Sequence, residues 1–247
     1  PAPDPQAEYA FVLPLSNTEA TWHDLAFLAT IPTASMLNNG RPAVLGAEDV
    51  TSLPAATQDF LNRYKPTHAY VLNGDGSSLA SVGTTHSMSA SSAGELAQTM
   101  LQTFWQSSER LFLASAEDYQ GAVLASSLAA RFDAPLLFID NLSPTELDSA
   151  QSTLGVSETL LVNLSGTPVD APSGKVEVFN DWVSIRSWLN ARTEEITYIA
   201  LTNVADRNTG RAQKMSLMAP MFTARRDGVV LPANFEMPMD VMTTASD

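Results

Sequence analysis

The sequence predicts an α/β protein built from tandem modules, each an open parallel sheet of the Rossmann-like or Toprim-like kind. Three observations support this prediction: apolar runs that are continuous, helical patterns between them, and the recurrence of one order of elements along the 247 residues. Continuous Val, Leu, Ile and Phe runs are typical of strands covered on both faces, and alternation with helices indicates right-handed parallel crossovers. We expect two complete modules and a truncated third, packed together.

The clearest sign of modules is a repeated sequence pattern. Pro42 and Pro135 lie 93 residues apart, and each follows a stretch rich in small residues and precedes a buried-strand pattern. Gly228 holds the same place a further 93 residues along the chain. We expect boundaries near 107 and 193, so the predicted modules are 1–107, 108–193 and 194–247, the last being the first part of a repeat. No long Gly/Ser or Pro-rich linker separates them, which indicates that they contact one another.

Within a module the expected order is strand, helix, strand, helix, strand, short extended piece and helix. The expected helix at 119–131 is rich in alanine, so it can approach a sheet closely. The expected helix at 181–191 has Asn180 or Asp181 as its N-cap. The other expected elements are strands at 9–13, 110–114 and 197–201, helices at 54–64 and 144–153, strands at 68–73 and 159–163, and a helix at 93–106.

Charge and composition exclude several classes of function. Thirteen Lys and Arg against 27 Asp and Glu give a net charge of −14, which opposes contact with nucleic acid phosphates. Without cysteine the chain has no disulfides or thiolate metal sites, and without an apolar run of 18 residues we expect no membrane insertion. Few lysines, no cysteine and many Ser and Thr favour an exported protein, extracellular or in the cell envelope. The opening Pro-Ala-Pro-Asp-Pro suggests a processed leader or a longer precursor.

One stretch carries a family resemblance. The run Glu117-Asp118-Tyr119, the Ala-rich segment 122–130, the strand patterns 134–139 and 160–163, and Leu154-Gly-Val156 lie within residues 110–167. Together these segments resemble the type 2 cell wall binding repeat, a family found in bacterial surface-layer and other exported envelope proteins. The resemblance implies a non-catalytic α/β module, usually in three copies around a pseudo-threefold axis, that holds a larger protein to anionic envelope polymer.

The common catalytic and cofactor motifs are absent from the sequence. His23, His68 and His86 have no zinc-ligand spacing, and no phosphate-binding Gly-rich loop is present. Ser165 lacks the first Gly of a nucleophile elbow, so a turn is the simpler interpretation. The segment 73–78 has part of a calcium loop without its closing Glu, and here too a plain turn is favoured. We therefore predict no catalytic residues, no cofactor and no metal.

Polar residues after the predicted strands are the candidate ligand-binding residues, because ligands collect at the carboxyl edge of parallel sheets. The alternative interpretation is that the acidic ones are helix N-caps, and it is the one we favour for Glu117, Asp118 and Asp206. The candidate residues are Glu117, Asp118, Asn141, Ser165, Gly166, Asn203, Asp206, Arg207 and Arg211.

Residues 203–214 form the most polar and most positive segment of this acidic chain. The segment is an insertion relative to the second module. One interpretation is an anion-binding loop that precedes a helix N-terminus, and the other is a solvated loop. Trp182 and Trp188 could stack on sugars, but their helical spacing with Ile185 and Leu189 favours a buried stripe.

Three functional hypotheses follow. The leading one is a non-catalytic envelope-binding region whose partner is cell wall or surface polymer. The second is the non-catalytic N-terminal region of a larger exported hydrolase. The third is a self-associating surface-layer or filament subunit, in which residues 235–242 dock a neighbour.

Overall fold

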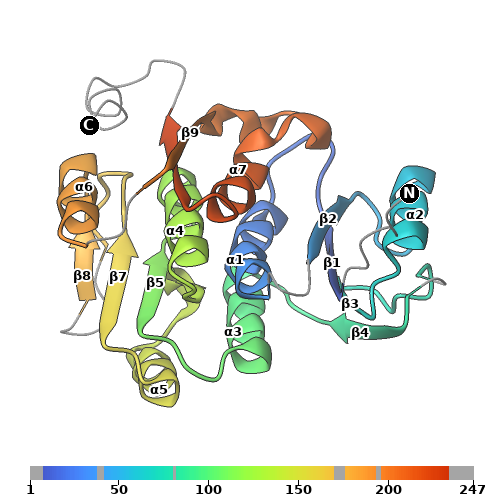
Figure 1. Ribbon diagram of the computed structural model, residues 1–247, viewed down its shortest axis with the longest axis horizontal. Helices are drawn as coiled ribbons and strands as arrows, with labels where there is room; N and C mark the ends of the chain where they lie inside the picture. The colour runs from blue at the N-terminus through green and yellow to red at the C-terminus, as the bar shows by residue number, and fades with distance from the viewer. Residues whose placement is uncertain (1–7, 38–41, 80–81, 170–175, 193–195, 234–247) are drawn as a thin grey trace.

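The computed structural model describes residues 8–37, 42–79, 82–169, 176–192 and 196–233, and it contains three parallel sheets (Figure 1). The first sheet has the strand order β2-β1-β3-β4, and the second has the equivalent order β6-β5-β7-β8. The third contains β10 and β9 in the described part of the chain, which matches the first two positions of the other sheets. The predicted α/β class with tandem parallel sheets is therefore confirmed.

The elements fall into three repeats that follow one order. Repeat one consists of β1 (Tyr9–Pro14), α1 (Trp22–Met36), β2 (Ala43–Ala47), α2 (Ala55–Tyr64), β3 (His68–Leu72), β4 (Thr84–Met88) and α3 (Ala93–Phe104). Repeat two consists of β5 (Arg110–Ala114), α4 (Tyr119–Arg131), β6 (Leu136–Phe138), the 3-10 helix η2 (Ile139–Asn141), α5 (Pro144–Leu154), β7 (Glu158–Val162), β8 (Val176–Phe179) and α6 (Trp182–Asn190). Repeat three contains β9 (Tyr198–Asn203), the 3-10 helices η3 (Val204–Asn208) and η4 (Arg211–Gln213), α7 (Met215–Ala224) and β10 (Gly228–Ala233).

The first helices of the three repeats form the centre of the molecule. Figure 1 shows α1, α4 and α7 side by side between the two larger sheets, and each of the three packs against the other two. Small side chains permit this close approach: Ser126 Oγ donates to the carbonyl of Leu28 at 2.7 Å, and Ser35 Oγ donates to the carbonyl of Ala130 at 2.9 Å. Most of the buried apolar residues described in the three repeats thus belong to one large core, and a smaller cluster that includes Val12, Leu61 and Val71 of repeat one lies apart from it.

Pairing between strands refines the sequence alignment by one residue. If Phe11 of β1 and Phe112 of β5 are matched, their strand partners Val44 and Leu136 are equivalent. These two positions are 92 residues apart, whereas Pro42 and Pro135 are 93 residues apart. By strand pairing, Pro42 and Pro135 are therefore one position away from being equivalent. The division at 107 and 193 stays a prediction.

Repeat three differs from the others in the exposure of its first strand. Leu111 to Ala114 of β5 are fully buried between β6 and β7, as Ala10 to Leu13 of β1 are between β2 and β3. In β9, by contrast, Tyr198 is 37% exposed and Leu201 is 48% exposed, because in the described part of the chain β9 pairs with β10 alone. Among the described residues, no helix has the length and apolar character needed to cross a bilayer.

Candidate functional site

Asp118 lies at the carboxyl edge of the second sheet and acts as the N-cap of α4. Its carboxylate accepts hydrogen bonds from the backbone N–H groups of Gly121 at 2.9 Å, Leu164 at 2.5 Å and Ser165 at 3.1 Å. The carboxylate is buried, and these three donors compensate for its loss of water. The N-cap interpretation is confirmed for Asp118 and is wrong for Glu117, which precedes the cap and is exposed. The Asp118 carboxylate also fastens the loop after β7 to the start of α4.

The other candidate residues of the second repeat differ in their distance from this cap and in what they contact. Glu117 is exposed, and so are Ser165 and Gly166, which form the turn after β7. Ser165 Oγ donates to Asn163 Oδ1 at 2.9 Å, and Gly166 has a positive φ of 73°, which favours glycine. The structure therefore brings Asp118 and Ser165 into contact. Asn141 ends the 3-10 helix η2, and its side chain lies outside the described part of the structure.

Asn203 and Asp206 are capping residues in the third repeat. Asn203 Oδ1 accepts from the backbone N–H of Ala205 at 3.0 Å and so caps η3. Asp206 accepts from the backbone N–H of Ser216 at 2.7 Å and from its hydroxyl group, next to the start of α7. A carboxylate at a helix N-terminus is favoured both by the free N–H groups and by the helix dipole.

Arg207 and Lys214 converge on a carboxylate of the first repeat. Lys214 is buried, and its Nζ donates to Asp24 Oδ1 at 2.9 Å and to the carbonyl of Glu19 at 2.9 Å. Arg207 Nε lies 3.5 Å from Asp24 Oδ2, and Asp24 is completely buried. Asp24, Arg207 and Lys214 together carry a net charge of +1, and the nearby carboxylate of Asp206 neutralises it.

Tyr119 connects this cluster to the second repeat. Its hydroxyl lies 2.8 Å from Ser216 Oγ, and the Arg207 guanidinium lies 4.6 Å from the centre of its ring. The ordinary pKa of a tyrosine phenol already lies well above neutral pH, and burial raises the pKa of Tyr119 further, so its hydroxyl is protonated and can donate a hydrogen bond. We call these six residues the polar junction: Asp24, Tyr119, Asp206, Arg207, Lys214 and Ser216.

The structure shows a role for residues 203–214 that the sequence did not predict. The segment folds into η3 and η4, and Lys214 is fully buried, so the solvated-loop interpretation is wrong for that residue, while anion binding stays a prediction. The inserted residues carry Lys214 to a carboxylate on α1, so this segment joins repeat three to repeat one. Arg211 does not join the cluster. It is half-buried, and within the described part of the chain its Nη1 has no hydrogen-bond partner.

Sequence reasoning missed four members of the polar junction: Asp24, Tyr119, Lys214 and Ser216. Asp24 gives one usable signal, since Thr21 and Asp24 have capping-box spacing and form that box at the start of α1. Lys214 lies within the segment that the sequence marked as positive. The pairing of residues 190 positions apart has no local signal, because it depends on how α1 packs against α7.

The residues considered for metal or sugar binding have structural roles. Asn73, at the start of the supposed calcium loop, donates to the carbonyl of Ala90 at 2.9 Å, and Asp75 accepts from the N–H of Ser77 at 2.9 Å, so this segment is a turn. His68 Nδ1 lies 3.3 Å from His86 Nε2 on neighbouring strands. Trp182 and Trp188 are buried as the stripe predicts, and so is Ile185, while Leu189 is half-buried.

The sheets and the junction define a class of protein: an α/β repeat protein in which the polar residues after the strands largely cap helices and join the repeats. No protein-family model matches the sequence, and no curated protein matches it.

Solved structures with this fold include Cwp8 from Clostridium difficile, at 16% identity and a TM-score of 0.71, with 96% of this chain and 43% of that chain covered. Cwp6 from Clostridium difficile is also similar, at 14% identity and a TM-score of 0.71, with 98% of this chain and 40% of that chain covered. The chain thus spans less than half the length of either. The likeness confirms the fold that the resemblance to the type 2 cell wall binding repeat implies.

Proposed function

We propose that this chain is a non-catalytic region that holds an exported protein on the cell envelope by binding cell wall or surface polymer. The observation that carries the proposal is the fold likeness over 96% of the chain to Cwp8 and over 98% to Cwp6, which are cell wall proteins. The place of action is then the envelope or the extracellular side of the cell.

The hydrogen bonds that the candidate carboxylates make to the protein itself support a binding role for the chain over a catalytic role. Asp118 accepts three backbone hydrogen bonds, and Asp206 binds Ser216 through both oxygens. A general acid or base must exchange a proton with substrate, and carboxylates that are held as helix caps are poorly placed to do so. The exposed candidates, Glu117, Ser165, Gly166 and Asn203, are the ones available to a ligand.

Sedimentation with cell walls tests the proposal. Purified chain is mixed with native walls and with walls from which the anionic polymer has been extracted, over a range of salt and with calcium or a chelator. We expect the chain to pellet with native walls and to stay in solution with extracted walls. Because the chain carries a charge of −14, binding to an anionic polymer should strengthen as salt rises or when calcium is added.

Failure to pellet with native walls under every ionic condition would contradict the proposal. Equal pelleting with native and extracted walls would show that the polymer is not the ligand. The hydrolase and self-assembly hypotheses stay predictions. The docking segment 235–242 of the latter lies outside the described residues, and a concentration-independent monomer mass in light scattering would contradict self-assembly.

A further inference from the structure

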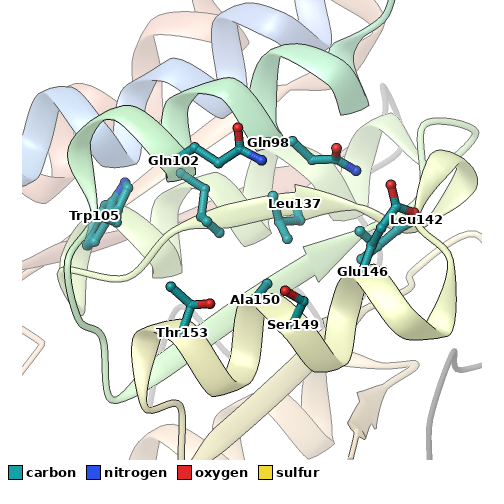
Figure 2. A pocket seen from close by; sticks show the side chains of 10 residues that line it. Gln98, Gln102, Trp105, Leu137, Leu142, Glu146, Ser149, Ala150 and Thr153 are labelled. Carbon is teal, nitrogen blue, oxygen red and sulfur yellow. The ribbon is translucent and has the colours of Figure 1, made fainter.

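A groove lies between α3 of repeat one and α5 of repeat two, and β6 forms its floor (Figure 2). In the described part of the chain α3 packs against β6 and η2 and makes little direct contact with α5, so the two helices stand apart. The space between them is about 300 Å³, at the lower end of the range for small-molecule sites, which is about 300–1,000 Å³. The groove therefore has room for a short ligand.

The two helical walls of the groove carry uncharged polar side chains. Gln98 and Gln102 lie one turn apart on α3. Ser149 and Thr153 lie one turn apart on α5, on the other side of Leu137 (Figure 2). Gln102, Ser149 and Thr153 are exposed, so their polar groups are open to a ligand. Amide and hydroxyl groups both donate and accept hydrogen bonds, which suits a ligand that carries several hydroxyl groups.

The floor and the two ends of the groove are largely apolar. Leu101, Leu137 and Leu142 line it and are buried. Trp105 lies at the end of the groove away from Leu142 (Figure 2). Its Nε1 donates to Thr33 Oγ1 at 3.1 Å, so the indole presents apolar carbon atoms to the groove. Polar walls above an apolar floor fit a sugar, whose ring has hydroxyl groups at its edge and C–H groups on its faces.

The charge of the groove opposes an anionic ligand. Among the described residues that line it, Glu146 is the one with a charge. Hydrogen bonds from the hydroxyl and the backbone N–H of Ser143 hold the pKa of Glu146 below its usual value, so its carboxylate is ionised at neutral pH. Together with the net charge of −14, this carboxylate repels phosphate and carboxylate groups. It can still accept hydrogen bonds from sugar hydroxyls.

We propose that the groove between α3 and α5 binds an uncharged sugar unit, with the polar walls on its hydroxyl groups and the apolar floor against its ring. The inference rests on the proposed function and deepens it, because it names the part of the envelope polymer that the chain contacts. An acidic chain can hold an anionic polymer in this way, through the neutral sugar units of that polymer. The groove contains none of the candidate residues predicted from the sequence, so it is an additional site.

Saturation-transfer NMR of the full chain with free sugars tests the inference. The probes are glucose, galactose, mannose and their 2-acetamido counterparts, each added to millimolar concentrations. We expect saturable binding of at least one of these sugars, with amide shifts confined to α3, β6 and α5. The 6-phosphate of the sugar that binds should bind about threefold more weakly or less, because the groove and the chain are negatively charged.

Ser149→Trp fills the groove, and Ser152→Trp is its matched control. Both serines are exposed on α5, and of the two Ser149 alone lines the groove. We expect Ser149→Trp to weaken sugar binding about tenfold or more, and Ser152→Trp to leave it unchanged.

Gln102→Ala removes one hydrogen-bonding group from the α3 wall and should weaken binding about fivefold. Gln106→Ala is the control for this change, because Gln106 is an exposed glutamine outside the groove. All four substituted side chains are exposed, so the unfolding temperature of each variant should match that of the unchanged chain.

Three results would overturn the inference. The first is the absence of saturable binding for every sugar of the panel. The second is tighter binding of the 6-phosphate than of the neutral sugar. The third is an equal effect of Ser149→Trp and Ser152→Trp.

Sedimentation with cell walls separates this inference from the proposed function. If the unchanged chain does not pellet with native walls, the proposed function fails, whichever sugars bind. If the chain pellets and Ser149→Trp pellets as well as Ser152→Trp does, the groove does not hold the wall polymer, and this inference alone fails.

Discussion

Asp118 shows at the scale of single residues how a candidate ligand-binding carboxylate serves the fold. Replacement by Ala leaves three N–H groups without their acceptor, that of Gly121 buried and those of Leu164 and Ser165 partly buried, and each such loss costs about 1–3 kcal/mol where water cannot replace the carboxylate. We expect Asp118→Ala to lower the free energy of unfolding by about 2–4 kcal/mol, as measured by urea denaturation.

Glu117→Ala is the control for this change, because the neighbouring carboxylate is exposed and lies outside the cap. Its effect should stay within about 0.5 kcal/mol. Equal effects of the two substitutions would contradict the structural role of Asp118. If the walls then bind the Glu117→Ala variant more weakly than the unchanged chain, Glu117 belongs to the ligand site.

Whether the sequence predicts the role of a residue depends on how far along the chain its contact partners lie. The cap at Asp118 was predictable, since an acidic residue at the start of a helical pattern has a local reason to be there. The burial of Lys214 was not predictable from the sequence, because a lysine in a polar segment is ordinarily solvated. Only the packing of α1 against α7 brings Asp24 within 2.9 Å of its Nζ.

The bounds of the helices and strands were predicted more accurately than the contacts of the candidate site residues. The expected helix at 119–131 and the strand at 110–114 coincide with α4 and β5, because continuous apolar runs and capping residues mark them locally. Asp181 caps α6, as one of the two expected residues. The segment after β9 could not be predicted in this way, since η3 and η4 are short helices held by contacts to repeat one.

Glu158 joins three elements of repeat two and should make their stability depend on pH. Its carboxylate accepts from Arg110 Nε of β5 at 2.8 Å, from Trp188 Nε1 of α6 at 3.0 Å, and from Arg192. Burial opposes ionisation, but these donors outweigh it and hold the pKa of Glu158 below its usual value.

Because the folded pKa of Glu158 is lowered, its stabilising effect is present above the ordinary glutamate pKa and is lost as pH falls through the folded value. We expect Glu158→Gln to reduce the free energy of unfolding by about 1–2 kcal/mol at pH 7, and the difference should disappear in acid. Urea unfolding at pH 7 and in steps below pH 5 measures both. Glu109→Gln is the control, since that side chain is 69% exposed, and a pH-independent difference for Glu158→Gln would contradict the argument.

The whole molecule is expected to unfold as one unit, although its sheets are separate. Most of the buried apolar residues described in the three repeats share one core around α1, α4 and α7, and the polar junction crosses the same centre; repeat one also has a smaller, separate cluster. The described part of repeat three is held in this arrangement because α4 packs against β10 and α7 against α1. Repeats that share a core lose their independent stability, so the free energy of unfolding belongs to all three together.

The pair formed by Asp24 and Lys214 tests this cooperativity. Lys214→Met removes the cation 2.9 Å from Asp24 Oδ1, and among the described residues the counter-charge left to this buried carboxylate is the more distant Arg207. We expect a loss of about 3–5 kcal/mol, partly restored when Asp24→Asn is added, because the neutral amide removes the buried charge and can still accept from Thr21. Lys65→Met is the control, since Lys65 is exposed.

Amide exchange in the Lys214→Met variant tests whether the repeats unfold together. If exchange in α6 of repeat two rises together with exchange in α7, the repeats unfold as one unit. A loss of protection confined to α7 and β10 would show that repeat three unfolds alone.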